Sequence, residues 1–377
     1  MKTTIPFFLP YRSGREEAFL AQALASSHWS GDGPFSKKCS KILEQMTGCP
    51  ALLTPSGTHA LELAFMTLNL EPGSEVILPS YTFVSSATCL VQFGLKPVFI
   101  DVREDTLNID ETLIEQALSP KTSAILAVHY AGVGAEMDAI LAVARKRGLA
   151  VVEDAAQAVH SFYKGKALGS LGDLGAFSFH HTKNFSCGEG GALVVGDHRR
   201  LKAAEIHREK GTDRKQFLEG RIDKYTWQDR GSSYLLSDLS AAVLCAQLSA
   251  AEEIGARKKR IYETYREGLS GVAPERMKLP VISSGCRSNH HFFHVLLESA
   301  ATRSKLAHYL KDQGVETAAH FVPLHDSPAG LKFGAARGTF PVSEKAGETL
   351  LRLPSHANLT PDEQERVIGT VRDFFDE

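Results

Sequence analysis

The chain has 377 residues, 43% of them hydrophobic, and carries 42 Lys and Arg against 44 Asp and Glu, a formal net charge of -2 at pH 7. A chain of this length is expected to form two lobes, because single hydrophobic cores stop growing at about 250–300 residues. The charge balance leaves no basic surplus for a nucleic-acid backbone, so nucleic acid is excluded as an expected partner.

The start of the chain and its cysteines favour a cytoplasmic protein. Pro6, Pro10 and Arg12 cut the first apolar run short of the about 7–15 apolar residues that a signal peptide needs. No later stretch approaches the about 18 consecutive apolar residues of a membrane span. The six cysteines include no CxxC pair, which is typical of reduced, buried thiols. We therefore expect a cytoplasmic location and no membrane partner.

Short apolar, β-branched runs alternate with longer helical stretches in the first half of the chain. The runs predict strands at 51–54, 75–80, 96–102, 123–130, 149–155, 174–180 and 191–195. The stretches between them, such as 58–70 and 136–148, have apolar residues at helical spacing. This alternation predicts an α/β fold with a large, mostly parallel sheet, and in such sheets the ligand lies beyond the carboxyl ends of the strands.

The pattern changes after about residue 245. A helix, a strand, a second helix and a second strand are predicted in turn at 250–269, 290–297, 303–314 and 315–321. The last helix is expected to begin with Thr360 as N-cap, Pro361 at the first helical position and Glu363 completing a capping box. We therefore expect a large domain at 1–245 and a smaller C-terminal α+β domain at 246–377.

Two side chains after neighbouring strands could carry chemistry. Asp154 ends the run 149–154, where a buried carboxylate needs a partner, although Asp at such a turn can equally be a helix N-cap. Lys183 follows the run 174–180, and a lysine is usually a solvated side chain. The aromatic run before Lys183 and the GEGG segment after it favour a chain held close to a bulky ligand.

Two further groups could bind parts of a cofactor. Ser56, Gly57 and Thr58 begin a predicted helix, where N–H groups, hydroxyls and a glycine can hold a phosphate, although Ser and Thr are also ordinary caps. Phe83 could lie on a flat ring, although core packing is its commoner role. With the carboxylate and the lysine, these groups fit pyridoxal 5'-phosphate (PLP): the carboxylate would keep the ring nitrogen protonated, and the lysine would bond to the carbonyl and then move a proton.

Several segments of the chain have the form of family motifs, namely GDGPF, LLTPSGT, PSYTFVSSA, VVEDAAQAVHSFYKGKALGSLG, FSFHHTKN and DKYTWQDRGSSYLLSDL. From about residue 30 to the C-terminal LRLPSHANLTPDE, the chain resembles the sugar aminotransferases of PLP fold type I known as the DegT/StrS family. The resemblance implies an aspartate-aminotransferase-like fold, PLP as cofactor and a homodimer with shared active sites. It also implies transfer of an amino group from L-glutamate to a nucleotide-linked keto-deoxysugar, in the deoxyamino sugar biosynthesis that serves cell-surface polysaccharides.

The resemblance also implies a role for each matching residue. It makes Lys183 the lysine that holds the cofactor covalently and Asp154 the partner of the ring nitrogen, both catalytic. It puts Gln157 beside the phenolic oxygen of the ring, stacks Phe83 on the ring, and has the phosphate held by Gly57, Thr58 and Ser178. Many members carry GYNYR where this chain has GSSYL, so Ser233 stands at the asparagine that reaches the partner subunit's phosphate, and Leu235 stands at the arginine.

Two other functions stay open at this point. Sugar dehydratases of the same fold use the pyridoxamine form and have histidine at the lysine position; His180 and His181 lie nearby, but the spacing from FSF puts Lys183 there. A non-catalytic sugar-sensing regulator could keep the fold, but the complete set of cofactor residues argues against it.

Three other segments of the chain give weaker signals of a binding site. His290, His291 and His294 lie on a predicted strand whose alternate residues face opposite ways, so no metal site is expected. VHYAGVGAEM imitates a dinucleotide fingerprint but lacks the third glycine. Lys210 and Arg214 in the loop REKGTDRKQ are expected on a solvated face, or, as the resemblance implies, near a substrate phosphate.

Overall fold

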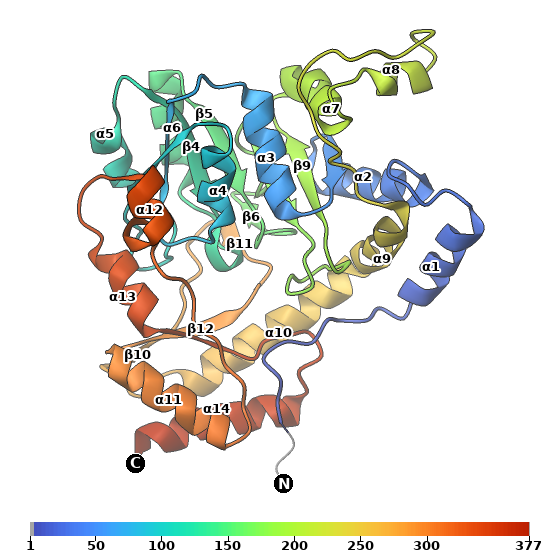
Figure 1. The fold of residues 1–377 in the computed structure, drawn as a ribbon. Helices are drawn as coiled ribbons and strands as arrows, with labels where there is room; N and C mark the ends of the chain where they lie inside the picture. Colours follow the sequence, from blue (N-terminus) through green and yellow to red (C-terminus); the bar gives the residue numbers. More distant parts are fainter. Residues whose placement is uncertain (1–3, 377) are drawn as a thin grey trace.

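The computed structural model describes residues 4–376, which form a large α/β lobe and a smaller α+β lobe (Figure 1). The large lobe is built on an eight-stranded sheet of order β1-β9-β8-β5-β4-β2-β3-β13. Neighbouring strands from β8 to β13 are parallel, and β9 runs against both β1 and β8. The strands are β1 (Ala51–Thr54), β2 (Glu75–Pro79), β3 (Lys96–Ile100), β4 (Thr122–Val128), β5 (Ala150–Asp154), β8 (Leu174–Ser178), β9 (Gly191–Val195) and β13 (Ala335–Ala336).

Helices cover both faces of this sheet, because its strands are apolar on both sides. Successive residues of β1 alternate between two separate hydrophobic clusters, with Leu53 in one and Leu52 in the other. One cluster includes side chains of α2 (Pro34–Thr47), α6 (Met137–Arg147) and α9 (Asp238–Leu248). The other includes side chains of α3 (Gly57–Leu68), α4 (Ser85–Val91) and α7 (Leu201–Arg208). Burial on both faces explains why the seven predicted strands are confirmed as short apolar runs.

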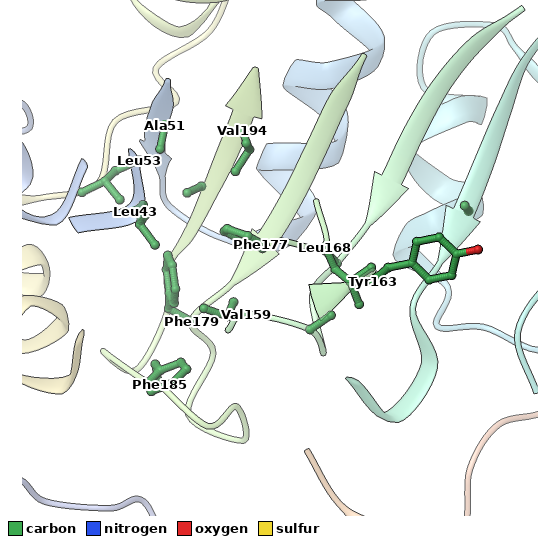
Figure 2. Close-up of a cluster of buried hydrophobic side chains, with 14 of the residues drawn as sticks. Leu43, Ala51, Leu53, Val159, Tyr163, Leu168, Phe177, Phe179, Phe185 and Val194 are labelled. Carbon is green, nitrogen blue, oxygen red and sulfur yellow. The ribbon is translucent and has the colours of Figure 1, made fainter. Parts of the chain in front are cut away.

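The hydrophobic cluster that contains Leu53 fixes the strand that leads to Lys183. Figure 2 shows Phe177, Phe179 and Phe185 in this cluster, with Leu43 of α2 and Leu53 of β1 nearby. All five side chains are buried. The two ends of the segment that carries Lys183 are therefore anchored in the core by aromatic rings.

The small lobe packs three long helices on a three-stranded sheet of order β10-β12-β14. Its elements are α10 (Ala251–Leu269), α11 (Ala300–Asp312), α14 (Pro361–Asp376), β10 (Met277–Lys278), β12 (Phe293–Leu297) and β14 (Leu350–Leu353). The predicted capping box of α14 is confirmed: the Thr360 hydroxyl accepts the Glu363 N–H at 3.2 Å, and the Glu363 carboxylate accepts the Thr360 N–H at 2.9 Å.

The predicted strand at 315–321 is wrong. Only isolated bridges form there, Val315 with Ile5 and Ala318 with Arg352. The end of the segment is held by the large lobe instead: the Tyr81 hydroxyl donates to the carbonyl oxygen of His320 at 2.7 Å and accepts the N–H of the next residue at 3.1 Å. These bonds turn the backbone toward the large lobe and away from a regular ladder.

The remaining elements are short, apart from α1. They are α1 (Glu16–Ala25), α5 (Ile114–Ala117), α8 (Arg214–Leu218), α12 (Pro328–Phe333), α13 (Pro341–Thr349) and a small sheet of β6 (Phe162–Tyr163), β7 (Lys166–Ala167) and β11 (Cys286–Arg287). Figure 1 shows α8 on an arm that projects from the large lobe. Within residues 4–376, no helix is both long and apolar enough to cross a membrane.

Two segments connect the lobes besides α10. β13 follows α10 and α11 of the small lobe in the chain but pairs with β3 at the edge of the large sheet. At the other end of the chain, Ile5 is buried in the core of the small lobe, and its N–H donates to the Gly314 carbonyl at 2.8 Å. The N-terminal segment then runs from the small lobe to α1 (Figure 1).

Candidate active site

A cavity of about 590 Å³ lies at the carboxyl ends of β1, β5 and β8. It is lined by all but one of the predicted site residues, namely Ser56, Gly57, Thr58, Phe83, Asp154, Gln157, Ser178 and Lys183. Ser233 does not line it; this residue is exposed and pairs with Glu209 through an isolated bridge. The parallel sheet therefore gathers side chains from distant parts of the sequence at one edge, as such sheets do.

Asp154 is the last residue of β5, and its carboxylate is buried at the cavity wall. The Ser86 hydroxyl donates to Oδ2 at 2.7 Å, and the Ala156 N–H donates to Oδ1 at 3.1 Å. Both donors are neutral, and among the described residues no ion pair involves this carboxylate. A buried carboxylate is stable when it is paired, so the site is suited to a cationic group of a ligand.

Glu153, the neighbouring acid, has a structural role. Its carboxylate accepts the N–H groups of Gly169, Leu171 and Gly172 at 2.6 to 2.8 Å. His129 lies 2.8 Å away through Nε2, while its Nδ1 accepts the backbone N–H of residue 135, so Nε2 carries the hydrogen. Successive residues of a strand face opposite sides, and this alternation leaves Asp154 as the acid at the cavity.

Lys183 lies on the turn after β8, half-buried in the cavity wall. Burial lowers the pKa of its amine to about 8; the charge of Arg352 lowers it further, and the charge of Asp154 opposes the shift. The backbone N–H of Lys183 donates to the His180 carbonyl at 2.8 Å, which fixes the turn. An amine with this pKa is about one-tenth neutral at pH 7, far more than an ordinary lysine, and can act as a nucleophile and proton carrier.

The start of α3 forms an anion cradle. The Ser56 hydroxyl accepts the His59 N–H at 3.1 Å as the helix N-cap, so this predicted phosphate ligand is engaged as a cap. The Thr58 hydroxyl lies 2.7 Å from the Ser85 hydroxyl. A Cβ on Gly57 would lie 2.8 Å from the Cβ of Ser178, so only glycine lets the helix start approach β8 this closely. Free N–H groups and the positive end of the helix favour a phosphate here.

The remaining predicted residues form the wall between these groups. The Phe83 side chain is 54% exposed, which is unusual for a phenylalanine. The centre of its ring lies 6.0 Å from the centre of the Phe321 ring, which also lines the cavity. The Gln157 side chain accepts the Ala131 N–H at 2.7 Å and is thereby fixed. The carboxylate, amine, aromatic face and anion cradle together fit the ring nitrogen, carbonyl, ring and phosphate of PLP.

Several cavity residues were not found from the sequence. They come from the N-terminal segment and the small lobe and include Phe7, Phe8, Tyr11, Lys258, His291, His320, Phe321, Arg352 and His356. Burial lowers the pKa of His291 and His320, so both rings are neutral at pH 7. The segment LRLP, in which an arginine interrupts an apolar strand, was the available signal for Arg352.

The loop that carries Lys210 and Arg214 does not line the cavity. The Lys210 ammonium lies 2.7 Å from Glu209 and the Arg214 guanidinium 3.6 Å from the same carboxylate. Within residues 4–376, no group of three or more His, Cys, Asp or Glu side chains is arranged to hold a metal.

The fold and the site define a PLP-dependent enzyme of fold type I. The chain belongs to the DegT/DnrJ/EryC1/StrS aminotransferase family, whose model matches residues 12–372. It is 33% identical to the spore coat polysaccharide biosynthesis protein SpsC of Bacillus subtilis over 97% of each chain.

Solved structures agree with this assignment. The aminotransferase TlmJ from Streptoalloteichus hindustanus has a TM-score of 0.91 and 32% identity over 99% of both chains. The PLP form of Spr1654 from Streptococcus pneumoniae has a TM-score of 0.90 and 27% identity over 99% of both chains, and a PMP form of that protein is also known. The chain is therefore a PLP-dependent sugar aminotransferase.

Proposed function

We propose that this enzyme transfers the amino group of L-glutamate to C4 of dTDP-4-keto-6-deoxyglucose, giving dTDP-4-amino-4,6-dideoxygalactose. Amino-group transfer is supported above all by one observation: Lys183 and Asp154 line the same cavity as the anion cradle at Gly57. The choice of sugar is supported by the resemblance of the motifs to those of the transaminase that makes this product. A role in cell-surface polysaccharide formation is supported by the likeness to SpsC.

Each residue of the site has its own role in the proposed transfer. Bound PLP supplies an electron sink that lets a proton leave the carbon next to the transferred nitrogen. Asp154 holds a proton on the ring nitrogen, and Ser86 orients its carboxylate. Lys183 would accept the proton from one carbon and return it to another, because burial lowers the pKa of its amine to about 8. Phe83 lines the cavity and would stack on the ring of the bound cofactor.

The lysine argues against a dehydratase. His180 and Glu189 both line the cavity, and His180 Nε2 lies 3.6 Å from the Glu189 carboxylate, which engages this ring. In the part of the chain that the structure describes, Lys183 has no ion-pair partner, and it lies close enough to Asp154 for that carboxylate to affect its pKa. The same pair argues against a non-catalytic regulator, which has no use for an amine with a lowered pKa.

The proposed enzyme is a homodimer in which Ser233 of one subunit binds the phosphate in the partner's site. Ser233 is exposed and does not line the cavity of its own chain. Exposed apolar side chains on the arm, Leu218 at 62% and Trp227 at 81% exposure, support a contact with a second chain.

The test is to incubate the PLP-loaded enzyme with L-glutamate and dTDP-4-keto-6-deoxyglucose and to identify the product by NMR. We expect an amino group on C4 in the galacto configuration and one equivalent of 2-oxoglutarate, with neither formed by Lys183→Ala. Amination at C3, a gluco product, or turnover only with a UDP-linked sugar would contradict the proposed substrate. Loss of the sugar hydroxyl without 2-oxoglutarate would point to a dehydratase.

A further inference from the structure

Arg352 of β14 carries a guanidinium that has no acidic partner among the described residues. Of its five N–H donors, one Nη2 hydrogen reaches the Ala319 carbonyl at 3.3 Å, and its buried Nε has no hydrogen-bond partner. The guanidinium carbon lies 4.8 Å from the centre of the Phe7 ring and 5.5 Å from the centre of the Phe292 ring. Aromatic rings therefore fix the group in position without neutralising it.

Two other arginines of residues 4–376 that are shielded from solvent each have an acidic partner. Arg208 binds Asp32 and donates to the Leu53 carbonyl at 3.0 Å, and Arg337 binds Glu75 at 2.8 Å. The ammonium of Lys258, which also lines the cavity, donates to the carbonyl oxygens of His291 and Ser355. A partly buried arginine without an anion is costly, so the contrast with Arg208 and Arg337 points to an anion supplied by a ligand.

Arg352 is also close to the reacting amine. It lines the same cavity as Lys183, and its positive charge lowers the pKa of that lysine. Burial lowers the pKa of Arg352 itself to about 10, so the guanidinium stays charged at pH 7. The anion cradle at Gly57 belongs to another part of the cavity, formed by α3 and β8 of the large lobe, whereas Arg352 belongs to the small lobe.

We infer that Arg352 binds the carboxylate of the amino donor, an inference that rests on the proposed transfer from an amino acid. In an amino acid, the carboxylate is attached to the carbon that bears the reacting nitrogen, so it must lie close to Lys183. The diphosphate of a nucleotide sugar is separated from C4 by the sugar ring and lies farther from the reacting atoms. A guanidinium with several free N–H groups matches the two oxygens of a carboxylate.

The test uses glutarate, a dicarboxylate that lacks the amino group and cannot react. Its binding to the PLP-loaded enzyme is measured by calorimetry for the wild type, Arg352→Met and Arg352→Lys. Arg287→Met is the matched control, because Arg287 also stacks on a phenylalanine ring, 4.0 Å from the centre of Phe162, but is exposed and lies outside the cavity. Binding of dTDP is measured in parallel, and thermal unfolding confirms that each variant is folded.

We expect Arg352→Met to weaken glutarate binding about 10- to 100-fold and Arg352→Lys to weaken it less. Glutarate binding should be unchanged in Arg287→Met, and dTDP binding should be unchanged in all variants. The KM for L-glutamate should rise while the KM for the keto sugar stays the same. Unchanged glutarate binding by a folded Arg352→Met protein would overturn the inference, as would a loss of dTDP binding alone, which would assign Arg352 to the diphosphate. The calorimetry uses no sugar, so an error in the proposed sugar substrate would leave its result intact.

Discussion

At the scale of single residues, the chemistry depends on how burial changes Lys183. An ordinary lysine has a pKa of about 10.4 and is almost wholly protonated at pH 7. Burial lowers the pKa of Lys183 to about 8, so about one amine in ten is neutral at pH 7. The nearby Asp154 limits the shift because its negative charge favours the ammonium. The two residues together therefore set how readily the amine reacts.

The pH dependence of cofactor uptake tests this pKa. The neutral amine attacks the aldehyde, so the rate at which the apoenzyme takes up PLP should rise about tenfold from pH 6 to pH 7 and level off above about pH 8. The visible absorbance of the bound cofactor reports the rate, and borohydride reduction followed by peptide mass analysis should place the label on Lys183. A rate that still rises at pH 10, or label on Lys164 or Lys166, would contradict the assignment; Lys183→Ala is the control.

The sequence was informative where a residue's position on a strand decided its role, and less so elsewhere. Asp154 and Lys183 follow apolar runs, so the sheet edge could be predicted to bring them together. That Asp154 and not Glu153 faces the cavity needed the register of β5. Arg352 lies on a small-lobe strand, and a single sequence does not show how that lobe sits on the large one.

At the scale of secondary-structure elements, the approach of α3 to β8 forms the anion cradle. The strands of the large sheet could be predicted because each is a short apolar run buried on both faces. The segment 315–321 has a similar composition but is not a strand, since its backbone bonds with Tyr81 of the large lobe. Such a tertiary bond leaves no local pattern in the sequence.

Gly57→Ala tests the close approach. The new methyl group would lie 2.8 Å from the Cβ of Ser178, so the helix start or β8 must shift. Overpacking of this kind costs about 1–3 kcal/mol, and we expect PLP affinity to fall about tenfold or more, as measured by titration of the apoenzyme. Gly369→Ala in α14 is the control, because a Cβ there meets nothing within 4 Å and alanine should stabilise the helix by about 0.5–1 kcal/mol. Equal PLP affinity in both variants would show that the cradle tolerates the methyl group.

At the scale of the whole molecule, the cavity combines three parts of one chain. The large lobe supplies the anion cradle and the acid, the small lobe supplies Arg352, and the N-terminal segment supplies Phe7. The proposed dimer would add a fourth part, Ser233 of the partner subunit. The exposed position of Ser233 is consistent with that role, since this residue does nothing at the cavity of its own chain.

Mixed dimers test whether the site is shared. Lys183→Ala should be inactive, and Ser233→Asp should lose activity because its charge repels the phosphate. In a dimer of one chain of each kind, one site has an intact Lys183 and an intact Ser233, so an equal mixture should recover about a quarter of wild-type turnover. Subunit exchange is followed with differently tagged chains. Exchange without recovery would mean that each chain completes its own site.

The attachment of the N-terminal segment determines when during synthesis the cavity can form. The Phe7 N–H donates to the Glu316 carboxylate at 3.0 Å, across 309 positions of sequence. As the chain leaves the ribosome, the strands β1 to β9 are complete and can fold long before Glu316 emerges, while Phe7 has no place to bind. A nascent or prematurely terminated chain can therefore possess the acid, the lysine and the anion cradle and still lack a closed wall around them. Phe7 is made before Glu316 but can reach its native position only after Glu316 has been made.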